Sequence, residues 1–582
     1  GKTTLTWEWF THHLPDVFAG AFWCPAEENQ FTFDMFVDLA LGYLMRGKYD
    51  KRSFRSIQER IRLLVQHLRD RPCLLVIDGL EKWLRAWTHR GDIASADCDS
   101  RLGGQEGLDL FLSQLGGVTG PSRFVLTSRV LPAVLDRAPH AVIPVLDELA
   151  QARLRGLDDA AAVALLRSLG VRCDEQGALT IARAYDNHPL SLTILGKLAS
   201  RRYGGSVERF KTASRLVHDD RNLISLLDEM QQALPARDDS QHLLDLRAHF
   251  IETPSLGQFS HFLRWLAIHE HHLDLVARLA LHVDDDALRE ALAVLDDWSL
   301  ISWDRQDDSL HMHPMLGEHF RASSTRSPRI HAALSRWYLD QPVDDAKSLP
   351  EMRRRILAVE HALQAGEAAL CDDAVLSAAG QSSSLSEWLA RWGHQSTGID
   401  LLTRVVGLCP QPQRSLHLIS RGAMRTDLGR LTPAREDLTD AIGYLDAAPW
   451  RRRRHRQVLA GAYMNRGTAF ASSGNPLQAV ADADRALRVL TWPFGLVRRC
   501  PAMMADILTN RGAANRDLGH LSAAQSDATR ALQFYLRCRS DQGDQSGYFS
   551  RRIATVLMNR GNARSNARQY DLADRDYLQA LE

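Results

Sequence analysis

Hydrophobic and polar positions divide the chain into a first part in which strands and helices alternate and a longer part that is helical. Two short apolar runs, residues 73–78 and 123–129, have the pattern of strands buried in a parallel sheet. The spacing before, between and after them leaves room for helices. Beyond residue 129 the alternation stops and helical patterns follow.

Within the helical part, residues 154–159 are predicted to open an Asp-capped helix with Ala161, Leu165 and Leu166 on one face. Further on, Pro189 stands at the start of a helix, where its missing N–H costs nothing. Residues 298–303 and 309–313 flank a polar stretch and predict a β-hairpin, the wing of a winged helix.

From about residue 411 the chain repeats itself. A glycine recurs, and alanines follow it at +12 and +19 in each of four copies. Small residues in fixed register are typical of closely packed helix pairs, here the tetratricopeptide pattern of an α-solenoid. The glycines are Gly422, Gly467, Gly512 and Gly561; the alanines are Ala434, Ala479, Ala524 and Ala573, then Ala441, Ala486, Ala531 and Ala580.

Each repeat also carries an Arg directly before its glycine and an Asp fifteen residues after it. An internal Arg–Asp pair in each repeat is the simplest interpretation, and it makes these residues structural. The pairs are Arg421 and Asp437, Arg466 and Asp482, Arg511 and Asp527, and Arg560 and Asp576.

Three asparagines suggest where a partner binds. Asn465, Asn510 and Asn559 each precede the repeat arginine, on the helix that lines the concave groove of tetratricopeptide proteins. Their amides are candidates to bind the backbone of an extended protein or peptide trigger. The alternative is that they only make local hydrogen bonds.

Arginine runs form a second candidate surface. Residues 451–456, 498–499 and 551–552 precede successive repeats and are arginine-rich. A solvated face is the simpler interpretation, and an anionic ligand such as nucleic acid or an acidic protein is the alternative.

Composition narrows the class of protein. A chain of 582 residues should form three to five domains. Lys+Arg and Asp+Glu are both 71, so the net charge is +0 and disfavours a nucleic-acid partner. The 8 cysteines form no C-x-x-C pair, which favours reduced thiols in a cytoplasmic protein. No apolar run of about eighteen residues appears, so we expect no membrane segment.

The candidate chemistry begins at the first residue. Gly1-Lys2-Thr3-Thr4 matches the second half of the phosphate-binding loop G-x-x-x-x-G-K-[ST]. In such loops backbone N–H groups surround the phosphates, the Lys reaches the terminal ones, and the hydroxyl of the Ser or Thr, here Thr3, holds Mg²⁺. The first glycine and its strand would lie upstream, so we expect a chain truncated within the loop.

Two strand ends supply partners for this loop. Asp78 ends the first apolar run, where a parallel strand delivers a carboxylate to Mg²⁺. Arg129 ends the second and would face the γ-phosphate. Each residue alone could be an ordinary turn or surface residue. In this order they predict a site for ATP or ADP with Mg²⁺.

The ordered motifs resemble the NB-ARC-like branch of the STAND ATPases, which includes plant disease-resistance proteins, apoptotic scaffolds and bacterial sensors. The resemblance covers residues 1 to about 325. The carrying motifs are Gly1-Lys2-Thr3-Thr4, Leu75-Val76-Ile77-Asp78-Gly79-Leu80-Glu81, Leu126-Thr127-Ser128-Arg129, His188-Pro189-Leu190 and Met312-His313-Pro314.

The resemblance implies two further nucleotide contacts. Pro189 would pack on the adenine, and His313 would touch the β-phosphate of ADP in the resting state. Without the resemblance, His313 is an ordinary polar residue at a strand end. Gly79 stands where the family often has a second carboxylate, so hydrolysis should be slow, with Glu81 a candidate for positioning water.

We therefore expect a multidomain α/β plus α protein. The predicted domains are a P-loop domain lacking its first strand, a helical subdomain, a winged helix, a helical connector and tetratricopeptide repeats. Their ranges are 1–150, 151–215, 216–325, 326–410 and 411–582.

The resemblance implies a switch that is closed by ADP through Lys2, Pro189 and His313. A trigger at the repeats would allow exchange to ATP, homo-oligomerisation and clustering of an upstream effector. The alternatives are a transcriptional regulator using the winged helix, against which the acidic stretch 284–297 counts, and a tetratricopeptide adaptor that does not switch.

Overall fold

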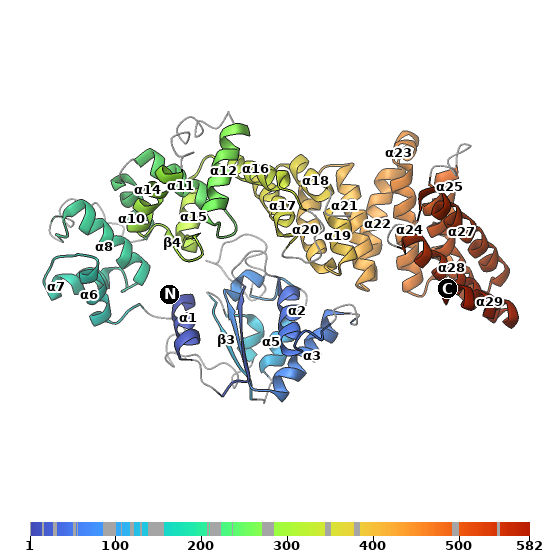
Figure 1. The fold of residues 1–582 in the computed structure, drawn as a ribbon, viewed down its shortest axis with the longest axis horizontal. Helices are drawn as coiled ribbons and strands as arrows, with labels where there is room; N and C mark the ends of the chain where they lie inside the picture. Colours follow the sequence, from blue (N-terminus) through green and yellow to red (C-terminus); the bar gives the residue numbers. More distant parts are fainter. Residues whose placement is uncertain are drawn as a thin grey trace. The chain divides into compact units, whose positions relative to one another are not determined.

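The structure is a computed structural model of the chain. It divides into two compact units, Gly1–Asp340 and Gln341–Glu582 (Figure 1). The residues that it describes are 2–13, 17–26, 32–49, 54, 56–84, 101–105, 107–116, 121–128, 131–137, 156–206, 209, 223–234, 237–269, 285–343, 351–377, 384–491, 500–543 and 547–581.

A three-stranded parallel sheet lies at the start of the first unit. Its strands are β1 (Gly20–Pro25), β2 (Cys73–Asp78) and β3 (Arg123–Leu126), paired in the order β1-β2-β3. All residues of the central strand β2 are buried, as its apolar sequence predicts. The second predicted strand is confirmed but ends at Leu126, three residues earlier than expected.

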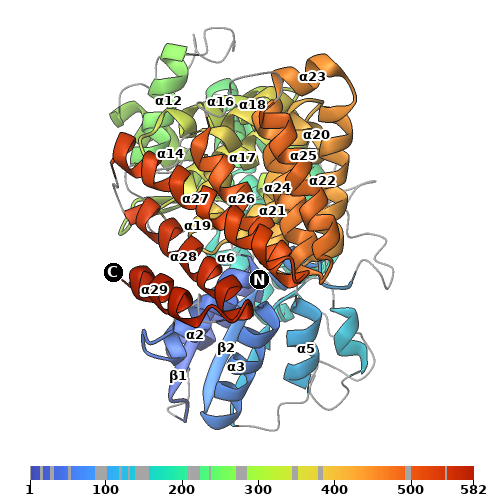
Figure 2. The same ribbon diagram turned by 90° about the vertical axis from the view of Figure 1, so that its right-hand side faces the viewer.

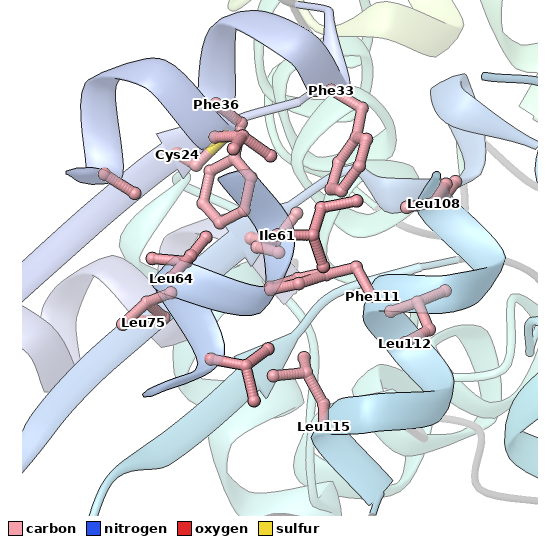
Figure 3. Packing of buried hydrophobic residues seen from close by; sticks show 14 of the residues in the cluster. Cys24, Phe33, Phe36, Ile61, Leu64, Leu75, Leu108, Phe111, Leu112 and Leu115 are labelled. Atoms are coloured by element: carbon pink, nitrogen blue, oxygen red, sulfur yellow. The ribbon is translucent and has the colours of Figure 1, made fainter. Parts of the chain in front are cut away.

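Helices α2 (Phe33–Leu44), α3 (Ile57–Asp70) and α5 (Leu108–Gly116) build the core beside this sheet. Figure 3 shows their aromatic and aliphatic side chains gathered into one cluster, in which the Phe111 ring contacts the rings of both Phe33 and Phe36. Burying each such side chain stabilises the fold by about 1.5–3 kcal/mol. The cluster fixes the sheet, and with it the end of β2.

A helical segment follows. The predicted Asp cap is confirmed, because Asp158 Oδ1 accepts a hydrogen bond of 2.6 Å from the Ala161 N–H. On the predicted face Leu166 is buried, but Ala161 and Leu165 are only half-buried. Ala162 and Val163 are the other buried residues of this helix. The helices are α6 (Asp159–Ser168), α7 (Glu175–Ala184) and α8 (Pro189–Tyr203).

The last part of the first unit contains the predicted hairpin. Strands β4 (Ser302–Asp304) and β5 (Ser309–His311) are antiparallel. The buried Arg247 guanidinium donates to the Leu310 carbonyl at 2.6 Å and so ties a helix to the hairpin. Assignment as a winged helix stays a prediction. The helices are α10 (Leu223–Ala233), α11 (Arg237–His249), α12 (Leu256–His269), α14 (Asp285–Asp297), α15 (Pro314–Ser323) and α16 (Ser327–Asp340).

The second unit is a solenoid in which successive helices pack side by side (Figures 1 and 2). Its helices are α17 (Arg353–Ala365), α18 (Ala368–Leu376), α19 (Leu385–Arg391), α20 (Gln395–Leu408), α21 (Gln413–Asp427), α22 (Leu431–Asp446), α23 (Pro449–Arg454), α24 (Arg456–Ser472), α25 (Pro476–Thr491), α26 (Pro501–Asp517), α27 (Leu521–Gln542), α28 (Tyr548–Asn566) and α29 (Tyr570–Leu581).

The repeated small residues lie where two helices approach each other closely. A Cβ atom on Gly422 would come within 2.8 Å of the Leu438 side chain. At Gly467 it would lie 3.3 Å from the Ala479 carbonyl oxygen. Any larger side chain would therefore push the paired helices apart.

All four predicted Arg–Asp pairs are present. In the second repeat Arg466 Nε donates to Asp482 Oδ2 at 2.7 Å and Nη2 donates to Oδ1 at 2.8 Å. The Asp side chain is fully buried, so the pair is shielded from water. The other three pairs have the same bidentate geometry.

The same arginines also connect neighbouring repeats, a role that was not predicted from the sequence. Arg466 Nη1 donates to Thr439 Oγ1 at 3.1 Å, and Arg511 Nη1 donates to Asp484 Oδ1 at 2.6 Å. Both acceptors lie two residues after the buried Asp of the preceding repeat. Each arginine thus joins its own helix pair to the one before it.

No helix among the described residues is long and apolar enough to cross a membrane. The seven cysteines in the described segments are all free thiols.

Removing one repeat arginine should destabilise the solenoid. Arg466→Leu removes the bidentate partner of the buried Asp482 carboxylate and leaves it only Arg485, whose Nη1 donates to Oδ1 at 3.0 Å. We therefore expect a loss of about 1–3 kcal/mol in the free energy of unfolding. Urea denaturation followed by circular dichroism would measure it.

Two variants serve as controls for this prediction. Arg488→Leu removes an exposed arginine and should change stability by less than about 0.5 kcal/mol. Arg466→Leu/Asp482→Leu removes both charges and should recover most of the loss. Equal stability of Arg466→Leu and Arg488→Leu would contradict a structural role for the pair.

Candidate nucleotide site

The structure brings together two of the predicted site residues that lie far apart in the sequence. Thr3 lies in the first turn of α1 (Lys2–His12), and Asp78 is the last residue of β2. Thr3 Oγ1 donates a hydrogen bond to Asp78 Oδ1 at 3.1 Å. The hydroxyl and the carboxylate that were predicted to hold Mg²⁺ are therefore in contact, one at the start of a helix and the other at the end of the central strand.

A third residue, Thr127, completes this arrangement. It directly follows β3, and its hydroxyl donates a short hydrogen bond to Asp78 Oδ1. The same hydroxyl accepts from the Gly79 N–H at 2.9 Å. The Asp78 carboxylate, only 2% exposed, is thus oriented by hydroxyl groups from two other segments.

Thr127 belongs to the motif Leu126-Thr127-Ser128-Arg129, but no role was predicted for it. The signal was its position directly after an apolar strand that neighbours β2 in the sheet. The Thr127 carbonyl also accepts from the N–H groups of Gly79 and Leu80, at 3.1 and 2.9 Å. The Thr127 N–H in turn donates to the Ile77 carbonyl at 2.9 Å, so backbone bonds between the two segments continue one residue past the end of β3.

Gly79, which directly follows Asp78, has a backbone conformation that favours glycine. Its φ of 77° lies in the left-handed region that favours glycine. A second carboxylate at this position would carry backbone strain. The next acid, Glu81, lies in the 3-10 turn η2 (Leu80–Trp83) and is buried. Its role in positioning water stays a prediction.

The residues present fit Mg²⁺ with a phosphate ligand. Mg²⁺ prefers oxygen ligands and usually takes one or two from protein, with water and phosphate completing its shell. Thr3 and Asp78 supply a hydroxyl and a carboxylate of this kind at the N-terminus of a helix, which favours anions. When bound, Mg²⁺ would neutralise charge on the phosphates.

The described segments contain no group of three or more His, Cys, Asp or Glu residues arranged to hold a metal ion. Gly1 and Arg129 lie outside the described residues, as does the side chain of Lys2. Thr4 is exposed on the first turn of α1. The roles of these four residues stay predictions.

Pro189 and His313 lie at the starts of two other helices. Pro189 is the first residue of α8 and is half-buried, with His188 capping the helix. His313 is exposed and caps α15, accepting a hydrogen bond of 3.3 Å from the Met315 N–H at Nδ1.

The capping bond defines which nitrogen of His313 carries the proton. A ring nitrogen that accepts from a backbone N–H is unprotonated, so the neutral imidazole has its proton on Nε2. Nε2 is then a donor suited to a phosphate oxygen. Contact of His313 or Pro189 with a nucleotide stays a prediction.

The three asparagines that were predicted to bind a partner differ in their surroundings. Asn510 is exposed and donates to Thr468 Oγ1 on the preceding repeat at 3.1 Å. This contact fits the alternative that the asparagine only makes a local hydrogen bond. Asn465 and Asn559 are half-buried, and within the described part of the chain their side chains make no hydrogen bond. They are therefore the better candidates for peptide contact.

Comparison with solved structures gives a structural likeness. No family model matches the chain, and no curated protein matches it. The chain is similar to a crystal structure from Pyrococcus horikoshii, a Signal Transduction ATPase with Numerous Domains (STAND) protein with a tetratricopeptide repeat sensor. The identity is 13%, the TM-score is 0.40, and 100% of this chain and 78% of that chain are covered. These values are too low to assign the chain to that family.

Loss of the Thr127 hydroxyl should weaken the site and the sheet around it. Thr127→Val keeps the shape but leaves the Gly79 N–H with only its longer bond to the carbonyl of residue 127, so we expect destabilisation of about 1–3 kcal/mol. Thr127→Ser keeps the hydroxyl and is the matched control. Thermal unfolding would compare them, and equal melting temperatures of the two variants would exclude this role.

Proposed function

We propose that the protein is a nucleotide-dependent signalling switch of the STAND type. The observation that carries this proposal is the hydrogen bond between Thr3 and Asp78. It joins the two predicted Mg²⁺-binding groups at the carboxyl end of the central strand of a parallel sheet. Gly1, Lys2, Thr3 and Thr4 would hold the phosphates of ADP or ATP, and Arg129 would contact the γ-phosphate.

In the resting state, ADP would hold the first unit closed. Pro189 would pack on the adenine, and the Nε2 proton of His313 would contact the β-phosphate. A hydrogen bond to a charged group contributes about 1.5–3 kcal/mol, which corresponds to a roughly ten- to hundredfold change in the closed-to-open ratio. One such contact is enough to bias a two-state equilibrium.

The solenoid would act as the sensor for a protein or peptide trigger. Its arginines connect each repeat to the preceding one, so a ligand in the groove would contact a continuous, stiff surface. Trigger binding would favour the open state only if the trigger binds that state more tightly. Exchange of ADP for ATP, homo-oligomerisation and activation of an effector would follow.

The switch predicts opposite effects for two variants. His313→Ala should assemble without trigger, because the closed state loses its phosphate contact. Lys2→Ala should neither retain ADP nor assemble, because it lacks the cation directed at the phosphates. Affinity-purified full-length protein would be analysed by size-exclusion chromatography, with its nucleotide identified by mass spectrometry.

Two results would contradict the proposal. Equal ADP in wild type and Lys2→Ala would show that residues 1–4 do not hold a nucleotide. An unchanged elution profile of His313→Ala, with ADP still bound, would show that His313 does not stabilise the closed state. His311→Ala is the matched control, since His311 is exposed and close by in sequence but does not cap α15.

A further inference from the structure

The short helix α23 presents an arginine-rich surface with an exposed aromatic ring. It connects α22 to α24 (Figures 1 and 2), and none of its residues is buried. It contains four consecutive arginines, Arg451–Arg454, and begins with Pro449 and Trp450. The Trp450 side chain is 60% exposed, which is unusual for so large an apolar group.

The Trp450 ring is held in place by Arg451. The Arg451 guanidinium lies 5.0 Å from the centre of the Trp450 ring and 4.2 Å from the centre of the Tyr444 ring. Its Nη1 also donates to the Tyr444 carbonyl at 3.4 Å. Cation–π contacts of this kind fix an indole while leaving much of its surface open. The exposed ring is therefore preorganised.

The other three arginines of α23 differ in whether they form an ion pair. Arg452 is neutralised by Asp446, which its Nε contacts at 2.5 Å. Arg453 and Arg454 are exposed, and neither forms an ion pair with any described residue. Two unpaired cations thus lie three and four residues after the exposed ring, where residues of a helix share a face.

We propose that α23 binds single-stranded nucleic acid, with a base stacked on Trp450 and backbone phosphates at Arg453 and Arg454. An aromatic platform beside guanidinium groups is how proteins bind single strands without reading sequence. A duplex hides its base faces, and an acidic peptide would use the cations but not the open ring. The net charge of the whole chain does not describe this local surface.

Binding of labelled single strands to the full chain tests this proposal. The probes are oligo-deoxythymidylate and oligouridylate, about ten nucleotides long, followed by fluorescence anisotropy. Trp450→Ala should weaken binding about five- to hundredfold, and Trp450→Phe should recover most of it. Arg453→Gln/Arg454→Gln should lower the slope of log affinity against log salt by about 1.4.

The matched control is Arg530→Gln/Arg575→Gln, which removes two exposed arginines from α27 and α29 and should leave affinity unchanged. All of the residues substituted in this experiment are exposed, so circular dichroism should show that each variant folds. Absence of wild-type binding at low salt would overturn the proposal. So would equal affinity of Trp450→Ala and wild type, or tighter, Trp450-dependent binding of oligo-glutamate. The binding of single strands to α23 does not depend on the proposed nucleotide site, so a failure of residues 1–4 to hold ADP or ATP would leave this test unchanged.

Discussion

The carboxylate of Asp78 is the constraint on which the candidate site depends. It accepts hydrogen bonds from hydroxyl groups of Thr3 and Thr127, which come from a helix start and from the end of a neighbouring strand. Because Asp78 is buried, its charge needs these partners, and they fix its orientation in return. The aromatic core between α2, α3 and α5 holds the strand that carries it.

The solenoid depends on the same physical principle. Each repeat buries an aspartate, and the repeat arginine compensates that charge with two parallel hydrogen bonds. The third nitrogen of the same arginine reaches the preceding repeat. Buried carboxylates with dedicated donors thus organise both units, one at a candidate nucleotide site and the other along a repeat array.

Features that a contiguous apolar run or a fixed residue spacing determines could be predicted from the sequence. Strand β2 and the Arg–Asp pairs were predicted correctly because an apolar run and a fixed spacing determine them. Thr127 was missed because its role depends on which strands are neighbours in the sheet. The acceptors Thr439 and Asp484 were missed because they share a position but not a residue type.

Magnesium-dependent nucleotide binding tests the central claim most directly. Isothermal titration of the full-length protein with ADP, in Mg²⁺ or in a chelator, would compare wild type with Asp78→Asn, which keeps the size of the side chain. We predict that Mg²⁺ strengthens binding to wild type, and that Asp78→Asn loses roughly tenfold or more of the affinity in Mg²⁺. Equal, magnesium-enhanced binding by both proteins would contradict the account.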